Sequence, residues 1–61
     1  MELPKILTAQ NIADYLQIGR KRVYELMQLS PNHGGIPTFN VGKSRRVELL
    51  DFETWLSQRK R

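Results

Sequence analysis

The sequence predicts a small α+β domain composed of two short helices, a β-hairpin and a closing helix. Apolar residues recur every three or four positions in residues 8–29 and again in residues 49–59, which is typical of helices with one buried face. Between these segments, polarity alternates on both sides of a Gly42-Lys43-Ser44 turn, which is typical of a hairpin. A chain of 61 residues has room for one domain, and we expect residues 1–61 to form it.

The first helix is expected over residues 9–17, after a lead-in segment at residues 1–7. Thr8 is a suitable N-cap, because its hydroxyl can accept a hydrogen bond from an N–H group of the first turn. Leu7 and Ile12 flank this cap at the spacing of a hydrophobic staple. The apolar stripe consists of Ala9, Ile12, Ala13 and Leu16. This helix is nearly free of basic residues, so we assign it a supporting role, with Tyr15 at the edge of the core.

The second helix is expected over residues 20–29, after a tight turn in which Gly19 tolerates backbone angles that other residues resist. Its apolar face consists of Val23, Leu26 and Met27. At about 100° per residue, the opposite face carries Lys21, Tyr24, Glu25 and Gln28. Aliphatic residues on one side and long polar residues on the other suit a helix that docks on the core and reads nucleic acid.

Positive charge is concentrated in two segments. The chain has ten lysines and arginines, six aspartates and glutamates, and a formal net charge of +4. The first cluster is Arg20, Lys21 and Arg22, and the second is Lys43, Arg45 and Arg46 with Ser44 among them. Three cations at a helix N-terminus oppose the helix dipole, but they become favourable beside a phosphate. Segregated positive charge predicts a polyanionic partner, and a solvated basic face without a partner is the alternative.

Residues 30–35 are expected to form an irregular loop, and two strands follow over residues 36–41 and 45–49. His33 has no second histidine, cysteine or close carboxylate beside it, so we assign it to the loop and not to a metal site. Alternation predicts that Phe39 and Val41 face the core and that Ile36 lies on the opposite face. Val47 is expected to point inward in the second strand.

The closing helix is expected over residues 50–59. Phe52, Trp55 and Leu56 follow the i, i+3, i+4 spacing of a buried helix face. This spacing favours Trp55 as a core residue over a residue that stacks on bases. The basic tail formed by Arg59, Lys60 and Arg61 is equally compatible with a phosphate contact and with a solvated end.

Two helices joined by a tight turn and followed by a basic hairpin tip make up a winged helix-turn-helix. The segments LTAQNIADYLQIGRKRVYELM, GGIPTFNVGKSRRV and LLDFETWL resemble the excisionase-type helix-turn-helix family. That family is related to the DNA-binding domain of MerR regulators and includes phage and transposon excisionases and AlpA-like regulators. The resemblance covers residues 7–56. The loop at residues 30–35 is longer than is usual in the family, and Arg45 stands where an aromatic residue is common.

The resemblance implies sequence-specific binding of double-stranded DNA by a recombination directionality factor. Such a protein assists the integrase of a phage or mobile element, which is a tyrosine recombinase, and often binds in several copies that bend DNA. A small transcriptional regulator of a phage or plasmid operon is the alternative within this class, and a protein–protein adaptor is the alternative outside it. The expected DNA-binding residues are Arg20, Lys21, Arg22, Tyr24 and Gln28 in the second helix and Lys43, Ser44, Arg45 and Arg46 in the wing.

Other classes of protein receive no support from the sequence. The absence of cysteine excludes disulfides and thiolate zinc sites and fits a reducing cytosol. No apolar run is long enough for a transmembrane span or a secretory signal, so no membrane partner is expected. No acid/base pair, metal cluster or activated nucleophile is present, so we expect neither enzymatic activity nor a cofactor. The expected location is the cytoplasm, on the nucleoid, with a bacterial or phage origin.

Overall fold

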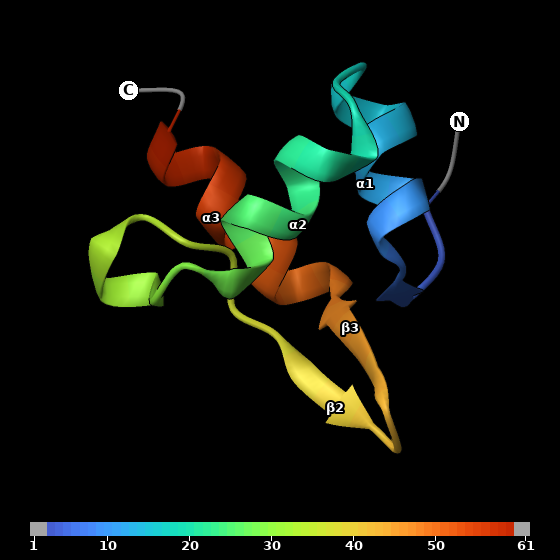
Figure 1. Ribbon diagram of the computed structural model, residues 1–61. Coiled ribbons are helices and arrows are strands. Elements are labelled where there is room, and N and C mark those ends of the chain that lie inside the picture. Colours follow the sequence, from blue (N-terminus) through green and yellow to red (C-terminus); the bar gives the residue numbers. More distant parts are fainter. Residues whose placement is uncertain (1–2, 60–61) are drawn as a thin grey trace.

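The computed structural model describes residues 3–59, which form three α-helices and a three-stranded antiparallel sheet (Figure 1). In chain order, the elements are β1 (Ile6–Leu7), α1 (Ala9–Leu16), α2 (Arg20–Gln28), the short 3₁₀ helix η1 (Pro31–His33), β2 (Phe39–Val41), β3 (Ser44–Glu48) and α3 (Leu49–Arg59). The β2–β3 hairpin projects from the helical body as a wing (Figure 1). The predicted winged helix-turn-helix is confirmed. Lys60 and Arg61 of the predicted basic tail lie outside the described residues.

The start of α1 has the predicted cap. The backbone N–H of Asn11 donates to Thr8 Oγ1 at 3.1 Å, and the backbone N–H of Thr8 donates to Asn11 Oδ1 at 2.9 Å. This reciprocal pair is a capping box, which satisfies two otherwise unpaired donors. Leu7 and Ile12 are both 0% exposed, as the predicted hydrophobic staple requires. The cap and the staple together fix the direction in which the chain enters α1.

The turn between α1 and α2 depends on a different residue from the one predicted. Gln17 has a φ of 57° and occupies the left-handed region, whereas Gly19 has a φ of −70° that any residue can adopt. The left-handed Gln17 ends α1, because its N–H and that of Ile18 both donate to the Ala13 carbonyl. Gly19 instead precedes α2 as its N-cap. The role assigned to Gly19 in the turn is therefore wrong.

The sheet contains a strand that was not predicted. Residues 6 and 7, expected to be part of a lead-in, pair with β3 in the register Ile6↔Glu48 and Leu7↔Val47. The strand order is β1-β3-β2, so β3 is the central strand and the wing continues into the body. A strand of two residues is too short to show an alternating pattern, and only its pairing with β3 defines it.

The hairpin was predicted with one error of orientation. Its strands pair in the register Phe39↔Arg46, Asn40↔Arg45 and Val41↔Ser44, and Gly42 supplies a φ of 62° at the turn. Ile36 is 1% exposed and Val41 is 56% exposed, the reverse of what alternation predicted. The strand begins only at Phe39, so Ile36 does not follow its alternation, and Val41 lies near the wing tip beyond the core. Val47 is fully buried, as predicted.

Two aromatic residues of α3 complete the core. Phe52 is 1% exposed, and its ring contacts Tyr15 edge-on with the ring centres 5.7 Å apart. Trp55 is 7% exposed, and its indole N–H donates to the Gly34 carbonyl at 3.0 Å, so its assignment to the core is confirmed. The buried hydrophobic residues are Leu7, Ala9, Ile12, Ala13, Val23, Met27, Ile36, Val47, Phe52 and Trp55.

The segment at residues 30–35 is more ordered than the predicted irregular loop. The Ser30 hydroxyl accepts a hydrogen bond from the backbone N–H of Asn32 at 3.3 Å, and Pro31 begins η1. Serine followed by proline is a helix-start signal, but one turn of helix has no periodicity to reveal it. Trp55 Nε1 and Arg59 Nη1 of α3 both donate to the Gly34 carbonyl, at 3.0 Å and 3.5 Å, and so hold α3 beside this segment.

Candidate nucleic-acid interface

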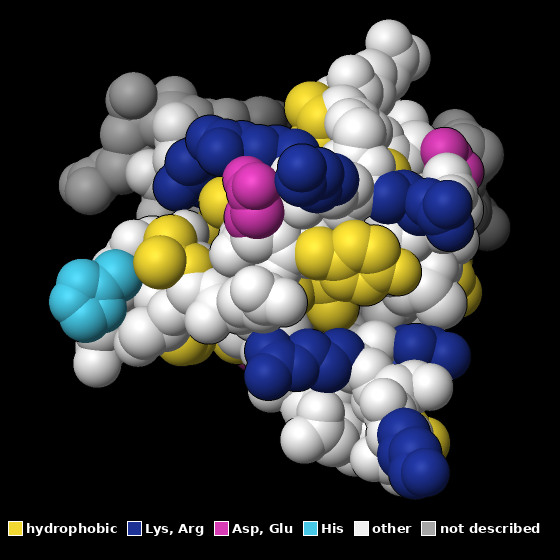
Figure 2. All heavy atoms as spheres, in the orientation of Figure 1, with side chains coloured by type: hydrophobic (Ala, Val, Ile, Leu, Met, Phe, Trp, Pro, Cys, Tyr) yellow, Lys and Arg dark blue, Asp and Glu magenta, His cyan; other side chains and the backbone are white. Residues whose placement is uncertain are grey.

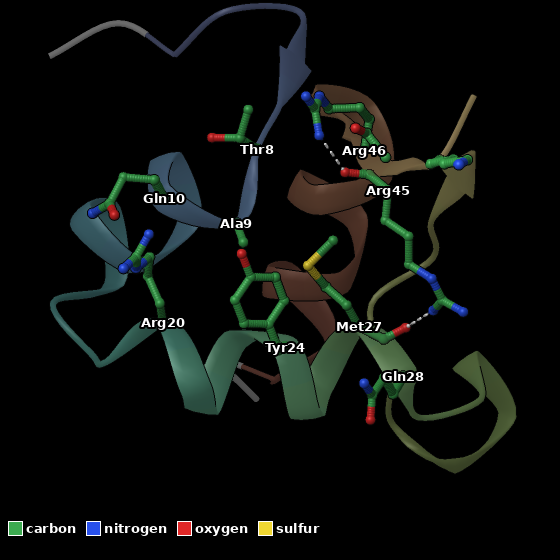
Figure 3. A pocket seen from close by; sticks show the side chains of 11 residues that line it. Thr8, Ala9, Gln10, Arg20, Tyr24, Met27, Gln28, Arg45 and Arg46 are labelled. Carbon is green, nitrogen blue, oxygen red and sulfur yellow. Dashed lines mark hydrogen bonds between the residues drawn. The ribbon is translucent and has the colours of Figure 1, made fainter. Parts of the chain in front are cut away.

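A groove runs between the N-terminus of α1, the exposed face of α2 and the wing (Figure 3). Its lining includes seven of the nine predicted DNA-binding residues, namely Arg20, Tyr24, Gln28, Lys43, Ser44, Arg45 and Arg46. The two clusters are separated by some twenty residues along the chain, yet they face the same hollow. Lys21 and Arg22 are not among the lining residues.

The packing of α2 determines which of its side chains enter the groove. Val23 and Met27 are 0% and 3% exposed, so this face of the helix is seated on the core. Tyr24 is half exposed and lies between Arg20 and Gln28 along α2 (Figure 3). An aromatic ring with a hydroxyl, flanked by a guanidinium and an amide, can make both apolar and hydrogen-bonded contacts with the edges of bases.

Arg22, one of the two predicted cations of α2 outside the groove lining, has a partner within the protein. Arg22 Nη1 lies 3.2 Å from Glu25 Oε1, and both side chains are more than half exposed. An exposed pair of this kind contributes little to stability, so Arg22 remains available to exchange Glu25 for a phosphate. Neither Arg22 nor Lys21 lines the groove.

The wing contributes a cation that already has a partner within the protein. Arg45 Nη1 donates to the backbone carbonyl oxygen of Met27 at 2.9 Å, across the gap between β3 and the end of α2 (Figure 3). Arg46 Nη1 donates to the carbonyl oxygen of Arg45 at 2.8 Å, within its own strand. Lys43 and Ser44 are exposed at the tip. The prediction treated all four as equivalent wing contacts, and the structure distinguishes Arg45 from the others.

Three residues that border the groove were not predicted. Thr8, Ala9 and Gln10 form the start of α1 and line the groove opposite α2. Gln10 Nε2 donates to Asp14 Oδ1 at 2.8 Å, which holds the amide at the rim. The N-cap pattern at Thr8 marks a helix N-terminus, where N–H groups favour anions, but it does not show which surface that end adjoins.

The described residues that line the groove include four cations and no carboxylate. Figure 2 shows lysine and arginine side chains spread across the face formed by α2 and the wing. A surface of one sign attracts a polyanion and orients it before contact is made. Within residues 3–59, no group of histidine, cysteine, aspartate or glutamate side chains is placed to hold a metal ion. No helix in this part of the chain is long and apolar enough to cross a membrane.

One comparison with known proteins gave a match. A model of the family described as "Helix-turn-helix domain" matches residues 6–60, which spans the fold from β1 through α3. No curated protein and no solved structure matches the chain significantly.

Proposed function

This chain belongs to the helix-turn-helix domain family of small excisionase-like and AlpA-like proteins, and we propose that it is a recombination directionality factor. A helix-turn-helix domain of this family supports sequence-specific DNA binding. The observation that best supports the proposal is the carboxylate-free groove on which α2 and the wing converge. In this proposal, residues 1–61 form one winged helix-turn-helix domain that acts on cytoplasmic, nucleoid DNA.

We place α2 in the major groove of the duplex. The major groove is about 12 Å wide and accepts an α-helix with its side chains. Tyr24 and Gln28 would face the edges of bases, while Arg20 would contact phosphate at one end of the helix. Lys21 and Arg22 would bind backbone outside the hollow. These contacts divide α2 into residues that read sequence and residues that hold the helix in register.

The wing would contact the duplex next to α2. Lys43 and Ser44 lie at the tip, and Arg46 lies in the hairpin pair farthest from the turn. Cations on such a wing favour the flanking backbone or a narrow minor groove. Contacts from two elements on adjacent grooves anchor a domain more firmly than α2 alone. They also leave the side of the domain away from the groove available for an integrase or for further copies of this chain on neighbouring sites.

The proposal is tested in two steps. Selection on random duplexes followed by footprinting defines the preferred site. That site is then placed beside attachment sequences, and excision by the integrase encoded nearby is measured with and without this protein. We expect excision to depend on the protein. Excision that proceeds equally well without it, together with repression of a reporter carrying the same site, would instead establish a transcriptional regulator. Integrase binding that persists without DNA, with no duplex selected, would indicate an adaptor.

A further inference from the structure

We propose that Arg45 sets the separation between α2 and the wing, and so acts as a positioning residue for the DNA-binding surface. The effect of Arg45 on DNA binding rests on the proposed function, whereas its contact with α2 is present in the free protein. The contact is the hydrogen bond from Arg45 Nη1 to the Met27 carbonyl oxygen at 2.9 Å. It joins the second residue of β3 to the last turn of α2 (Figure 3).

The carbonyl that Arg45 reaches needs a partner. The last four carbonyls of an α-helix have no N–H donor within the helix, so other groups must donate to them. In α2, the Leu26 carbonyl accepts from the N–H of Ile36 at 3.0 Å, and the Met27 carbonyl accepts from Arg45. The last turn of α2 contains no basic residue of its own. Arg45 therefore brings a positive charge to the negative end of the helix dipole, where a cation is stabilising.

The outer half of the wing has little else to hold it against the helices. Residues 40–45 are all exposed, and Val41 is not part of the core. Within residues 3–59, the Arg45–Met27 hydrogen bond is the one side-chain hydrogen bond or ion pair between residues 40–45 and α2. An isolated two-stranded ribbon is marginally stable and twists readily. Without this link, we expect the tip to move relative to α2.

The separation between α2 and the wing matters for binding. If α2 lies in one groove and the tip contacts the next stretch of backbone, both must be placed at the spacing of the duplex. Binding groups need to be held within about 0.5 Å of their productive positions by supporting contacts. A mobile tip would have to be ordered on binding, which lowers affinity.

Arg46 provides a matched control. It is adjacent to Arg45, carries the same charge and also lines the groove. Its guanidinium donates to the Arg45 carbonyl within the same strand and not to α2. Arg46→Ala therefore removes one positive charge and leaves the link to the helix intact. Arg45→Ala removes the charge and the link together.

The test measures the distance between α2 and the wing in the free protein. The chain has no cysteine, so Leu29→Cys and Val41→Cys, at residues 44% and 56% exposed, can be spin-labelled uniquely. Pulsed electron paramagnetic resonance then gives the distribution of label distances. We expect one narrow distribution in the parent and in Arg46→Ala, and a distribution at least about twofold broader in Arg45→Ala. Equal widths for Arg45→Ala and Arg46→Ala would overturn the positioning role.

DNA titrations with the unlabelled variants complete the test. Each alanine substitution should reduce the salt slope by about one if its charge contacts phosphate. Arg45→Ala should lose about tenfold more affinity than Arg46→Ala, the size expected when a hydrogen bond to a charged group is lost. Arg45→Lys keeps the charge, and if it restores affinity while the distance distribution stays broad, the positioning role is wrong. Failure of the parent to bind any duplex would contradict the proposed function alone, because the distance result requires no DNA.

Discussion

Replacing Gly35 with alanine should strongly destabilise the domain. Gly35 lies where the chain leaves η1 and passes beneath the end of α2. A Cβ atom at this position would lie 1.9 Å from the carbonyl oxygen of Leu29 and 2.5 Å from its carbonyl carbon. Both are backbone atoms, so no side-chain rotation can relieve the overlap. The alanine can be accommodated only if the loop moves away from α2.

The size of the effect follows from the contacts that this movement breaks. Ordinary van der Waals contact begins near 3.4 Å, so the overlap at 1.9 Å requires a substantial backbone shift. Such a shift strains the hydrogen bonds from Gly35 N–H to the Ser30 carbonyl and from Ile36 N–H to the Leu26 carbonyl, each 3.0 Å long. Each bond contributes about 1 kcal/mol, and partial exposure of Ile36 adds about 1 kcal/mol. We expect a loss of about 2–4 kcal/mol from a domain whose total stability is about 3–9 kcal/mol.

Urea and thermal unfolding followed by circular dichroism measure this loss. Tm should fall by roughly 10–25 °C. Gly19→Ala is the matched control, because a Cβ at Gly19 meets nothing within 4 Å and its φ is −70°. Its free energy of unfolding should change by less than about 0.5 kcal/mol. If Gly35→Ala also stays within about 0.5 kcal/mol of the parent, the argument from close approach is refuted.

Four further predictions concern binding and stability. If about six phosphates are neutralised, log K should fall against log salt with a slope of about −5, and a slope near zero would contradict DNA binding through this face. Gln28→Ala should change the ranking of duplexes in competition assays, and an unchanged ranking would remove Gln28 from the reading residues. Thr8→Ala should reduce the free energy of unfolding by about 1 kcal/mol, because the Asn11 N–H loses its acceptor at 3.1 Å; urea denaturation checks this, and no change would contradict the capping box. Trp55→Phe should reduce the free energy of unfolding by about 1–3 kcal/mol, since the Gly34 carbonyl loses the indole donor at 3.0 Å. Equal stability of the variant and the parent would contradict a stabilising role for this hydrogen bond.

Local signals in the sequence predicted the elements whose formation depends on near neighbours. The capping pattern at Thr8 and the spacing of Phe52 and Trp55 lie within one or two turns of helix, so they predict α1 and α3 closely. The features that were missed depend on distant partners. The strand at Ile6–Leu7 exists because β3 lies beside it, and Ile36 is buried because its side chain packs in the core that distant elements form.

The candidate site divides in the same way. The sequence itself determines the residue types needed for a nucleic-acid surface, since charge and helical spacing are local properties. These residues are the cations in two clusters, together with Tyr24 and Gln28 on the polar face of a helix. Tertiary structure alone brought Arg20, Tyr24 and Gln28 into one groove with the wing and added the start of α1 to its rim. It also gave Arg45 a partner in α2, because a hydrogen bond between residues 18 positions apart depends on how the sheet and helices pack.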